Sequence, residues 1–161
     1  MILLINICKE KLHELEFVKP IEDITKKLGK TKVVHYKNLK NKDIQQADKI
    51  IICGTSLKDN EFLKHLDKFS WIKNCKKPIL GICGGSHIIG LILGGKIRKK
   101  TEIGLKRTKL KNFLGITGEK EVYHLHNLQV LPETFQKNNL YATLFHPEVR
   151  NKEIILNFIN N

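Results

Sequence analysis

Residues 78–87, Pro-Ile-Leu-Gly-Ile-Cys-Gly-Gly-Ser-His, decide the fold of this chain. Their first half, 78–82, is a short apolar run typical of a strand buried on both faces. Their second half is rich in small residues and leads into an apolar helix expected over 88–93, which Gly94-Gly95 ends. Cys83 therefore lies where a buried strand turns sharply into a helix.

On both sides of this stretch, apolar runs of strand length alternate with amphipathic segments. The pattern is typical of parallel strands covered by helices, and we expect one α/β domain over residues 1–161. The strands are expected at 2–8, 32–36, 50–53, 78–82, 102–110, 121–125, 129–131 and 140–145. The helices are expected at 20–29, 59–74, 88–93 and 152–159.

The composition is that of a folded globular chain, with 161 residues of which 41% are hydrophobic and 28% charged. The apolar opening 1–5 is too short for a signal peptide or a membrane span, so we expect a cytoplasmic protein without a membrane partner. Lys and Arg outnumber Asp and Glu by 29 to 16. The basic residues are scattered and aromatic residues make up only 7%, which favours a solvated Lys-rich surface over a nucleic-acid site.

The four cysteines, Cys8, Cys53, Cys75 and Cys83, have no paired spacing and form no Cys/His ligand pattern. We therefore expect neither a disulfide framework nor a bound metal or other cofactor. His124 and His126 alternate along an expected strand and face the same side, which is a spacing able to bind a metal. No third ligand lies near them in the sequence, so we expect no metal site there.

Cys83 is the strongest candidate for a chemical role. A nucleophile at a strand-to-helix turn is held in a strained conformation that small neighbours, here Gly81 and Gly85, allow. The positive end of the following helix favours a thiolate over a thiol. The alternative is a buried cysteine in a glycine-rich turn, such as a phosphate-binding loop.

A thiolate nucleophile needs a base, and His146-Pro147-Glu148 offers one at the end of the apolar run 140–145. In an extended segment residues i and i+2 point to the same side, so Glu148 can orient the imidazole of His146. The alternative for this tripeptide alone is a solvated surface turn. Together with Cys83 it predicts a Cys-His-Glu triad.

With this pairing the chain resembles the class I glutamine amidotransferase domain. The resemblance spans nearly the whole chain, and within the family it looks most like the stand-alone glutaminase subunit of archaeal-type GMP synthetase. It implies a three-layer, flavodoxin-like fold with a mostly parallel central sheet between helices. The matching segments are 50–54, 78–83, Gly94-Gly95-Lys96, Glu102, His126 with Val130-Leu131-Pro132, Phe145-His146-Pro147-Glu148-Val149 and Asn157-Phe158.

The resemblance implies a role for each site residue. Cys83 would attack the side-chain amide of glutamine, His146 would protonate the departing ammonia, and Glu148 would orient His146. The thioester formed on Cys83 would then be hydrolysed to glutamate. The backbone N–H groups of Gly84 and Gly54 would form the oxyanion hole.

The chain departs from the family at several substrate-facing positions. The segment around His126 corresponds to the one that contacts the amino-acid end of the substrate. The family usually continues the turn with His and Gln, whereas this chain has Ser86 and His87, so His87 stands at the substrate side of the turn. Gly54-Thr55-Ser56 replaces Gly-Gly-Pro, and Ala142-Thr143-Leu144 replaces Gly-Val-Gln.

We therefore expect an enzyme that hydrolyses glutamine and supplies ammonia to a separate ATP-dependent synthetase, with GMP synthetase as the first candidate. The chain carries no nucleotide-binding signature of its own, which is why the partner is expected. One alternative is a hydrolase of another γ-glutamyl amide, suggested by Ser86-His87. The other is a non-catalytic regulatory protein on the same scaffold, against which the intact Cys83, His146 and Glu148 argue.

Overall fold

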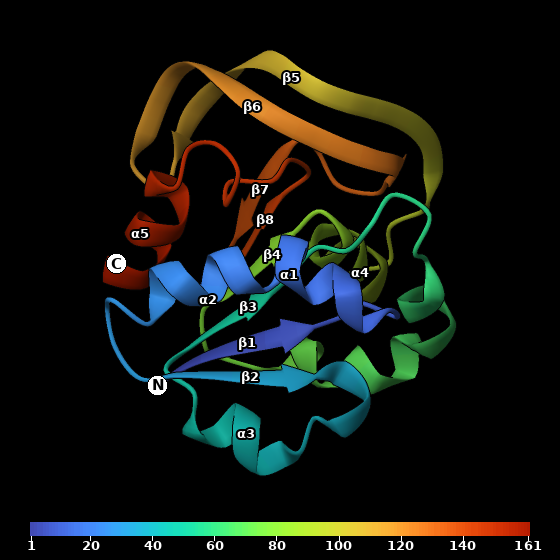
Figure 1. Ribbon diagram of the computed structural model, residues 1–161, viewed down its shortest axis with the longest axis vertical. Helices are drawn as coiled ribbons and strands as arrows, with labels where there is room; N and C mark the ends of the chain where they lie inside the picture. The colour runs from blue at the N-terminus through green and yellow to red at the C-terminus, as the bar shows by residue number, and fades with distance from the viewer.

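The computed structural model describes residues 1–161 and contains one large sheet and one separate hairpin (Figure 1). The large sheet has six strands in the order β2-β1-β3-β4-β8-β7, all parallel except β7, which is antiparallel to β8. The expected α/β fold with a mostly parallel central sheet is confirmed. Its strands are β1 (Ile2–Asn6), β2 (Thr31–His35), β3 (Lys49–Ile52), β4 (Ile79–Ile82), β7 (Thr134–Lys137) and β8 (Leu140–Thr143).

Helices cover both faces of this sheet, and none of them is long and apolar enough to cross a bilayer. Their hydrophobic residues form two clusters, one on each face. Figure 1 shows α1 and α2 in front of the sheet. The first cluster takes in α1 (Glu14–Phe17), α2 (Lys19–Thr25) and α5 (Glu153–Asn160). The second cluster contains residues of η2 (Tyr36–Asn38), of the 3₁₀ segment η3 (Glu61–Asn74) and of α4 (Gly84–Ile92), and α3 (Asn41–Gln46) packs against it. A short 3₁₀ turn, η1 (Lys11–His13), precedes α1.

The central strands β1, β3 and β4 are buried on both faces, as their uninterrupted apolar runs predict. Alternate residues of each strand belong to the two hydrophobic clusters, because successive side chains of a strand point to opposite faces of the sheet. Leu4, Ile51 and Leu80 enter the first cluster, and Leu3, Ile50 and Ile79 enter the second. The three strands thus form the rigid centre from which the loops at their carboxyl ends project.

The region after α4 differs from the expectation of several short strands. It is one long antiparallel hairpin of β5 (Arg98–Phe113) and β6 (Ile116–Gln129). Gly104 and Gly118, with φ of +100° and +106°, lie inside these strands, whereas the turn is at Leu114-Gly115. Glycines and charged residues interrupt the apolar pattern without ending the strands, because most of β5 is exposed to solvent.

Two helices also differ from the sequence expectation. The segment expected as an amphipathic helix over 59–74 is a run of 3₁₀ turns with a kink at His65 (φ −128°, ψ 33°). Phe69 and Ile72, three residues apart, are both buried, which fits the three-residue repeat of 3₁₀ turns. The helix α4 begins at Gly84, directly after Cys83, rather than at Ile88.

The candidate site lies at the carboxyl ends of the parallel strands. Ligands of open α/β sheets bind at this edge. Gly54 follows β3, Cys83 follows β4 and His146 follows β8, so three separate loops meet there. The β5–β6 hairpin arches over the β8–β7 side of the sheet (Figure 1), and β6 reaches Cys83, whose Sγ lies 3.5 Å from the carbonyl oxygen of Leu125.

Candidate active site

Cys83 occupies a strained backbone conformation at the start of α4. Its φ and ψ are 49° and −100°, a region that residues with a side chain rarely adopt. The turn is fixed on both sides, because the Cys83 N–H donates to the carbonyl of Thr143 (2.8 Å) and the Cys83 carbonyl accepts from the N–H of His87 (3.1 Å). The sulfur is therefore held at the N-terminus of a nine-residue helix.

The glycines around Cys83 are required by close backbone contacts. A Cβ at Gly81 would lie 2.5 Å from the carbonyl oxygen of Gly85, and a Cβ at Gly85 would lie 2.3 Å from that of Ile52. Neither contact can be relieved by rotating a side chain. The two glycines thus let α4 pack directly onto β3 and β4, which places its first turn beside the sulfur.

His146 and Glu148 form a buried pair just after β8. His146 Nδ1 and Glu148 Oε1 are 2.7 Å apart, and the two side chains are 1% and 0% exposed. The His146 backbone N–H donates to the carbonyl of Tyr123 (2.8 Å), so β6 fixes the backbone of this residue. The carboxylate accepts a hydrogen bond from Nδ1–H, which leaves Nε2 free to exchange a proton with a reacting group.

Cys83, His146 and Glu148 are brought together around Gly54. A Cβ at Gly54 would lie 2.7 Å from His146 Cε1 and 3.5 Å from Cys83 Cβ, so both side chains pack against this glycine. Burial alone would lower the pKa of His146, but the negative charges of Glu148 and of the Cys83 thiolate raise it well above its usual value. The arrangement therefore favours a protonated His146 beside Cys83.

A narrow pocket opens beside Cys83. Its free volume is about 10 Å³, which is room for about one water molecule. A loop over residues 55–60 covers one side of it, and the segment 125–128 of the hairpin covers the other. The two sides are joined where Asn127 Nδ2 donates to the carbonyl of Leu57 (3.1 Å).

Asp59 holds this loop in place. Its carboxylate accepts from the Thr55 hydroxyl (2.5 Å) and from the backbone N–H groups of Lys9 (2.7 Å) and Glu61 (3.2 Å). The sequence pattern places Asp59 only at the start of a helix and does not reveal the loop closure. The Asp-Asn pair at 59–60 is the sequence signal that could have revealed this loop, because Asp and Asn side chains commonly form hydrogen bonds with nearby backbone groups.

The four residues expected to bind substrate all border this site. His87 and His126 line the pocket with Gly84, while Gly54 lies behind the sulfur against His146. Gly84 is the first residue of α4, so its N–H belongs to the helix turn that has no partner inside the helix. Burial, together with the charges of His126 and His146, lowers the pKa of His87 to about 4, so this side chain is neutral at neutral pH.

The other cysteines do not line the pocket. Burial raises the pKa of the Cys8 thiol to about 11 and raises that of Cys53 well above its usual value. Cys75 is partly exposed and directly follows η3. Cys83 alone combines a thiol with a neighbouring imidazole and a helix N-terminus.

Comparison with known proteins places the chain in a family. The profile of the family described as glutamine amidotransferase class-I matches residues 13–148. A glutamine-hydrolyzing GMP synthase of Staphylococcus aureus is 31% identical, over 56% of this chain and 22% of that protein. The chain thus corresponds to less than a quarter of the length of these curated relatives.

Two solved structures share the fold over nearly the whole chain. A candidate GMP synthase subunit from Thermoplasma acidophilum superposes with a TM-score of 0.82 at 23% identity, covering 99% of this chain and 92% of that one. A glutamine amidotransferase from Thermotoga maritima superposes with a TM-score of 0.68 at 16% identity, covering 99% and 80%. Since the family profile spans most of its residues, the chain belongs to the class I glutamine amidotransferases.

Proposed function

We propose that this chain is a glutaminase that hydrolyses the side-chain amide of glutamine through a thioester on Cys83. The observation that carries the proposal is the strained Cys83 turn packed beside a His146 that Glu148 holds at 2.7 Å. A nucleophile, a base and an orienting carboxylate are the three groups that acyl transfer by a thiol requires.

In the first half of the reaction, Cys83 Sγ attacks the side-chain carbonyl carbon of glutamine. The negative charge that develops on the carbonyl oxygen is stabilised by the backbone N–H groups of Gly84 and Gly54. The imidazolium of His146 then gives its Nε2 proton to the leaving nitrogen, the C–N bond breaks, and ammonia departs. An acyl group remains on the sulfur as a thioester.

In the second half, water replaces ammonia. His146, now neutral, removes a proton from the water as its oxygen attacks the thioester carbonyl. The C–S bond breaks, glutamate leaves, and Cys83 returns to the thiolate with His146 protonated. Glu148 keeps the Nδ1 proton in place throughout and stabilises the positive charge of the ring.

We further propose that the ammonia serves a separate ATP-dependent synthetase, with a GMP synthetase as the first candidate. The likeness to a glutamine-hydrolyzing GMP synthase and to the candidate GMP synthase subunit from Thermoplasma acidophilum supports this choice. The chain acts as a single amidotransferase domain, and the activation of the acceptor takes place on the partner.

The narrow pocket supports control by that partner. Its free volume of about 10 Å³ does not hold glutamine in this conformation, and the loop 55–60, which forms one wall, is the segment that we expect to move when substrate enters. Docking of the synthetase would favour the open or rearranged loop and so raise the rate.

The test is an assay of glutamate release from glutamine by the full chain, first by itself and then with the synthetase and its substrates. We expect a low rate without the partner, a higher rate with it, and no rate from Cys83→Ser under either condition. Failure of the chain to release glutamate under both conditions would contradict the proposal and leave the non-catalytic alternative.

A second candidate function is the hydrolysis of another γ-glutamyl amide. It is favoured by His87, which is 3% exposed, neutral and at the pocket wall, where it offers a different hydrogen-bonding group from an amide side chain. A full rate on such a compound by the chain alone, with no response to any synthetase, would favour this function over the first.

A further inference from the structure

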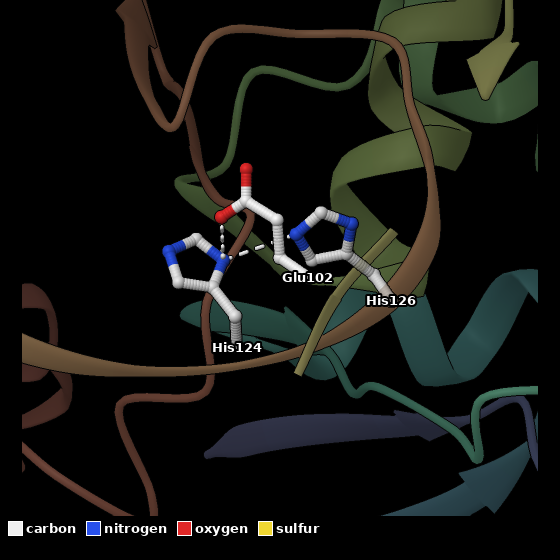
Figure 2. Close-up of side chains that lie close together, drawn as sticks. All are labelled: Glu102, His124 and His126. Atoms are coloured by element: carbon white, nitrogen blue, oxygen red, sulfur yellow. Dashed lines mark hydrogen bonds and ion pairs between the residues drawn. The ribbon is translucent and has the colours of Figure 1, made fainter. Parts of the chain in front are cut away.

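A second group of polar side chains is gathered by the hairpin. Glu102 lies on β5, and His124 and His126 lie on β6. Figure 2 shows the three side chains turned toward one another. Glu102 and His126 are direct cross-strand partners, and His124, two residues earlier, projects from the same face. His124 and His126 are 1% and 2% exposed.

The spacing of the three ligand atoms suits one metal ion. His124 Nδ1 lies 3.0 Å from His126 Nε2 and 3.5 Å from Glu102 Oε2, and all three atoms lie within 4.8 Å of one another. Bonds of about 2.0–2.1 Å to a tetrahedral ion put its ligand atoms about 3.3 Å apart. The two shorter contacts lie on either side of this value and the third is no longer than 4.8 Å, so side-chain rotations would bring all three atoms to one ion.

Glu133 prepares His124 to act as a ligand. Its Oε1 lies 2.8 Å from His124 Nε2, and its other oxygen accepts from the Thr108 hydroxyl. The carboxylate therefore holds the proton on Nε2 and leaves a lone pair on Nδ1, the atom that faces Glu102 and His126. A carboxylate behind a histidine in this way is the usual support of a metal-bound imidazole. The site thus offers two imidazoles and one carboxylate as donors.

Two lysines compete with a metal for Glu102. Lys100 Nζ lies 3.0 Å from Oε1, and Lys106 Nζ lies 3.3 Å from Oε2, the oxygen nearest His124. Their side chains are 50% and 48% exposed, so they can turn into solvent when an ion binds. Lys106 occupies the same oxygen that the ion would take.

We propose that Glu102, His124 and His126 form a binding site for a divalent transition-metal ion, with Zn²⁺ as the best match. Two imidazoles and one carboxylate are a zinc-type donor set, whereas Mg²⁺ and Ca²⁺ prefer oxygen ligands alone. The bound ion would join β5 to β6 at the point where β6 passes the sulfur of Cys83. The sequence shows the spacing of His124 and His126 but no third ligand near them, because Glu102 is brought to the histidines only by the register of the hairpin.

The test is a titration of the metal-free full chain with Co²⁺, followed by displacement with Zn²⁺. It is made in the Cys83→Ser background so that the thiol and His146 cannot supply a competing site. We expect one equivalent of Co²⁺ to give the visible absorption of a four- or five-coordinate ion, without a sulfur charge-transfer band. Zn²⁺ should abolish this absorption and raise Tm by several degrees, and Mg²⁺ and Ca²⁺ should do neither.

Variants define the ligands. Glu102→Gln and His124→Gln should each remove the one-to-one binding, and Glu133→Gln should weaken it by about 10–100-fold. Lys106→Gln should strengthen it, since a competing cation is removed. His65→Gln, a histidine on η3 remote from the hairpin, is the matched control and should leave the affinity unchanged.

An NMR measurement on the chain with its histidines unsubstituted tests the proposal even if the variants fail to fold. On addition of Zn²⁺, the ring C–H resonances of His124 and His126 should shift together, while those of His13 and His65 stay fixed. Absence of Co²⁺ absorption at millimolar metal, or wild-type affinity in a folded Glu102→Gln protein, would overturn the proposal. Shifts confined to other histidines would overturn it equally.

Discussion

Cys83 keeps a backbone conformation that costs of the order of 1–3 kcal/mol, because at φ 49° its Cβ crowds the carbonyl group of the preceding residue. The hydrogen bonds to Thr143 and His87 and the contacts of Gly81 and Gly85 offset this cost. The result is a sulfur fixed between a helix N-terminus and His146. This position brings the sulfur within reach of the two groups that activate a cysteine nucleophile, a helix N-terminus and an imidazole.

We therefore predict that Cys83 reacts with an alkylating reagent faster than any other thiol of the folded chain. Cys75 is the useful comparison, since it is more exposed than Cys83 but lies at no helix N-terminus and beside no imidazole. Limiting iodoacetamide at neutral pH, followed by peptide mass mapping, measures the order of labelling. Faster labelling of Cys75 would show that exposure rather than activation controls reactivity.

The triad assignment predicts unequal losses of activity. Glu148→Ala should retain at least about tenfold more glutaminase activity than Cys83→Ala or His146→Ala, because an orienting carboxylate assists the base without taking part in bond formation. Initial rates at saturating glutamine measure this. Wild-type turnover in Glu148→Ala would remove Glu148 from the triad and leave Cys83 and His146 as a pair.

The lowered pKa of the buried His87 leads us to predict that the stability of the chain changes with pH. Its pKa is about 4 in the folded chain and about 6.5 when unfolded, so the unfolded chain binds more protons between these values. The free energy of unfolding should therefore fall as the pH falls from about 6.5 to about 4, by up to about 3 kcal/mol from this residue. Urea unfolding of wild type and His87→Gln at both pH values isolates the effect, since the variant should lose less stability in acid. Equal losses in the two proteins would contradict a buried neutral His87.

At the scale of elements, the packing of α4 on β3 depends on one glycine. Gly85→Ala should lower the free energy of unfolding by about 1–3 kcal/mol, since its Cβ would lie 2.3 Å from the carbonyl oxygen of Ile52. Gly29→Ala is the matched control, because nothing lies within 4 Å of its Cβ position. Denaturant midpoints of the two variants should differ clearly, and similar midpoints would mean that α4 can shift at no cost.

Sequence patterns predicted the elements whose cause is local. The apolar runs of β1, β3 and β4 and the glycines around Cys83 identify buried strands and the turn after them. The patterns did not predict the single long hairpin, because the glycines between the strands expected at 102–110 and 121–125, Gly115 and Gly118, resemble a loop, whereas Gly118 lies within β6 at positive φ. They also did not separate the 3₁₀ turns of η3 from an α-helix, since both bury Phe69 and Ile72.

The candidate site was predictable where residues close in sequence act together, as His146 and Glu148 do. It was not predictable where the register of two strands, or the course of a loop, decides which side chains meet. Glu102 meets His124 and His126 only through the pairing of β5 with β6. Asn127 likewise meets Leu57 only because the hairpin passes over the loop after β3.

At the scale of the whole molecule, the net charge of +13 would make docking to the proposed synthetase sensitive to salt. Activation by an acidic face of the synthetase would rely on charges that are screened beyond about 10 Å at 0.1 M salt. The proposed reaction involves buried groups, since the His146 and Glu148 side chains are 1% and 0% exposed, and interactions between buried charges are screened much less.

We therefore predict that raising the salt concentration from about 0.05 M to about 0.5 M lowers the activation of glutamine hydrolysis by the synthetase and leaves the rate of the isolated chain nearly constant. The reason is that salt weakens the approach of the two surfaces but not the chemistry at Cys83. Paired rate measurements at each salt concentration, with the partner titrated to saturation, separate weaker docking from slower turnover. If excess partner restores the full rate at high salt, the charges act in docking. A rate that falls equally with and without the partner would show that salt acts on the pocket itself, and the basic surface would then have no part in activation.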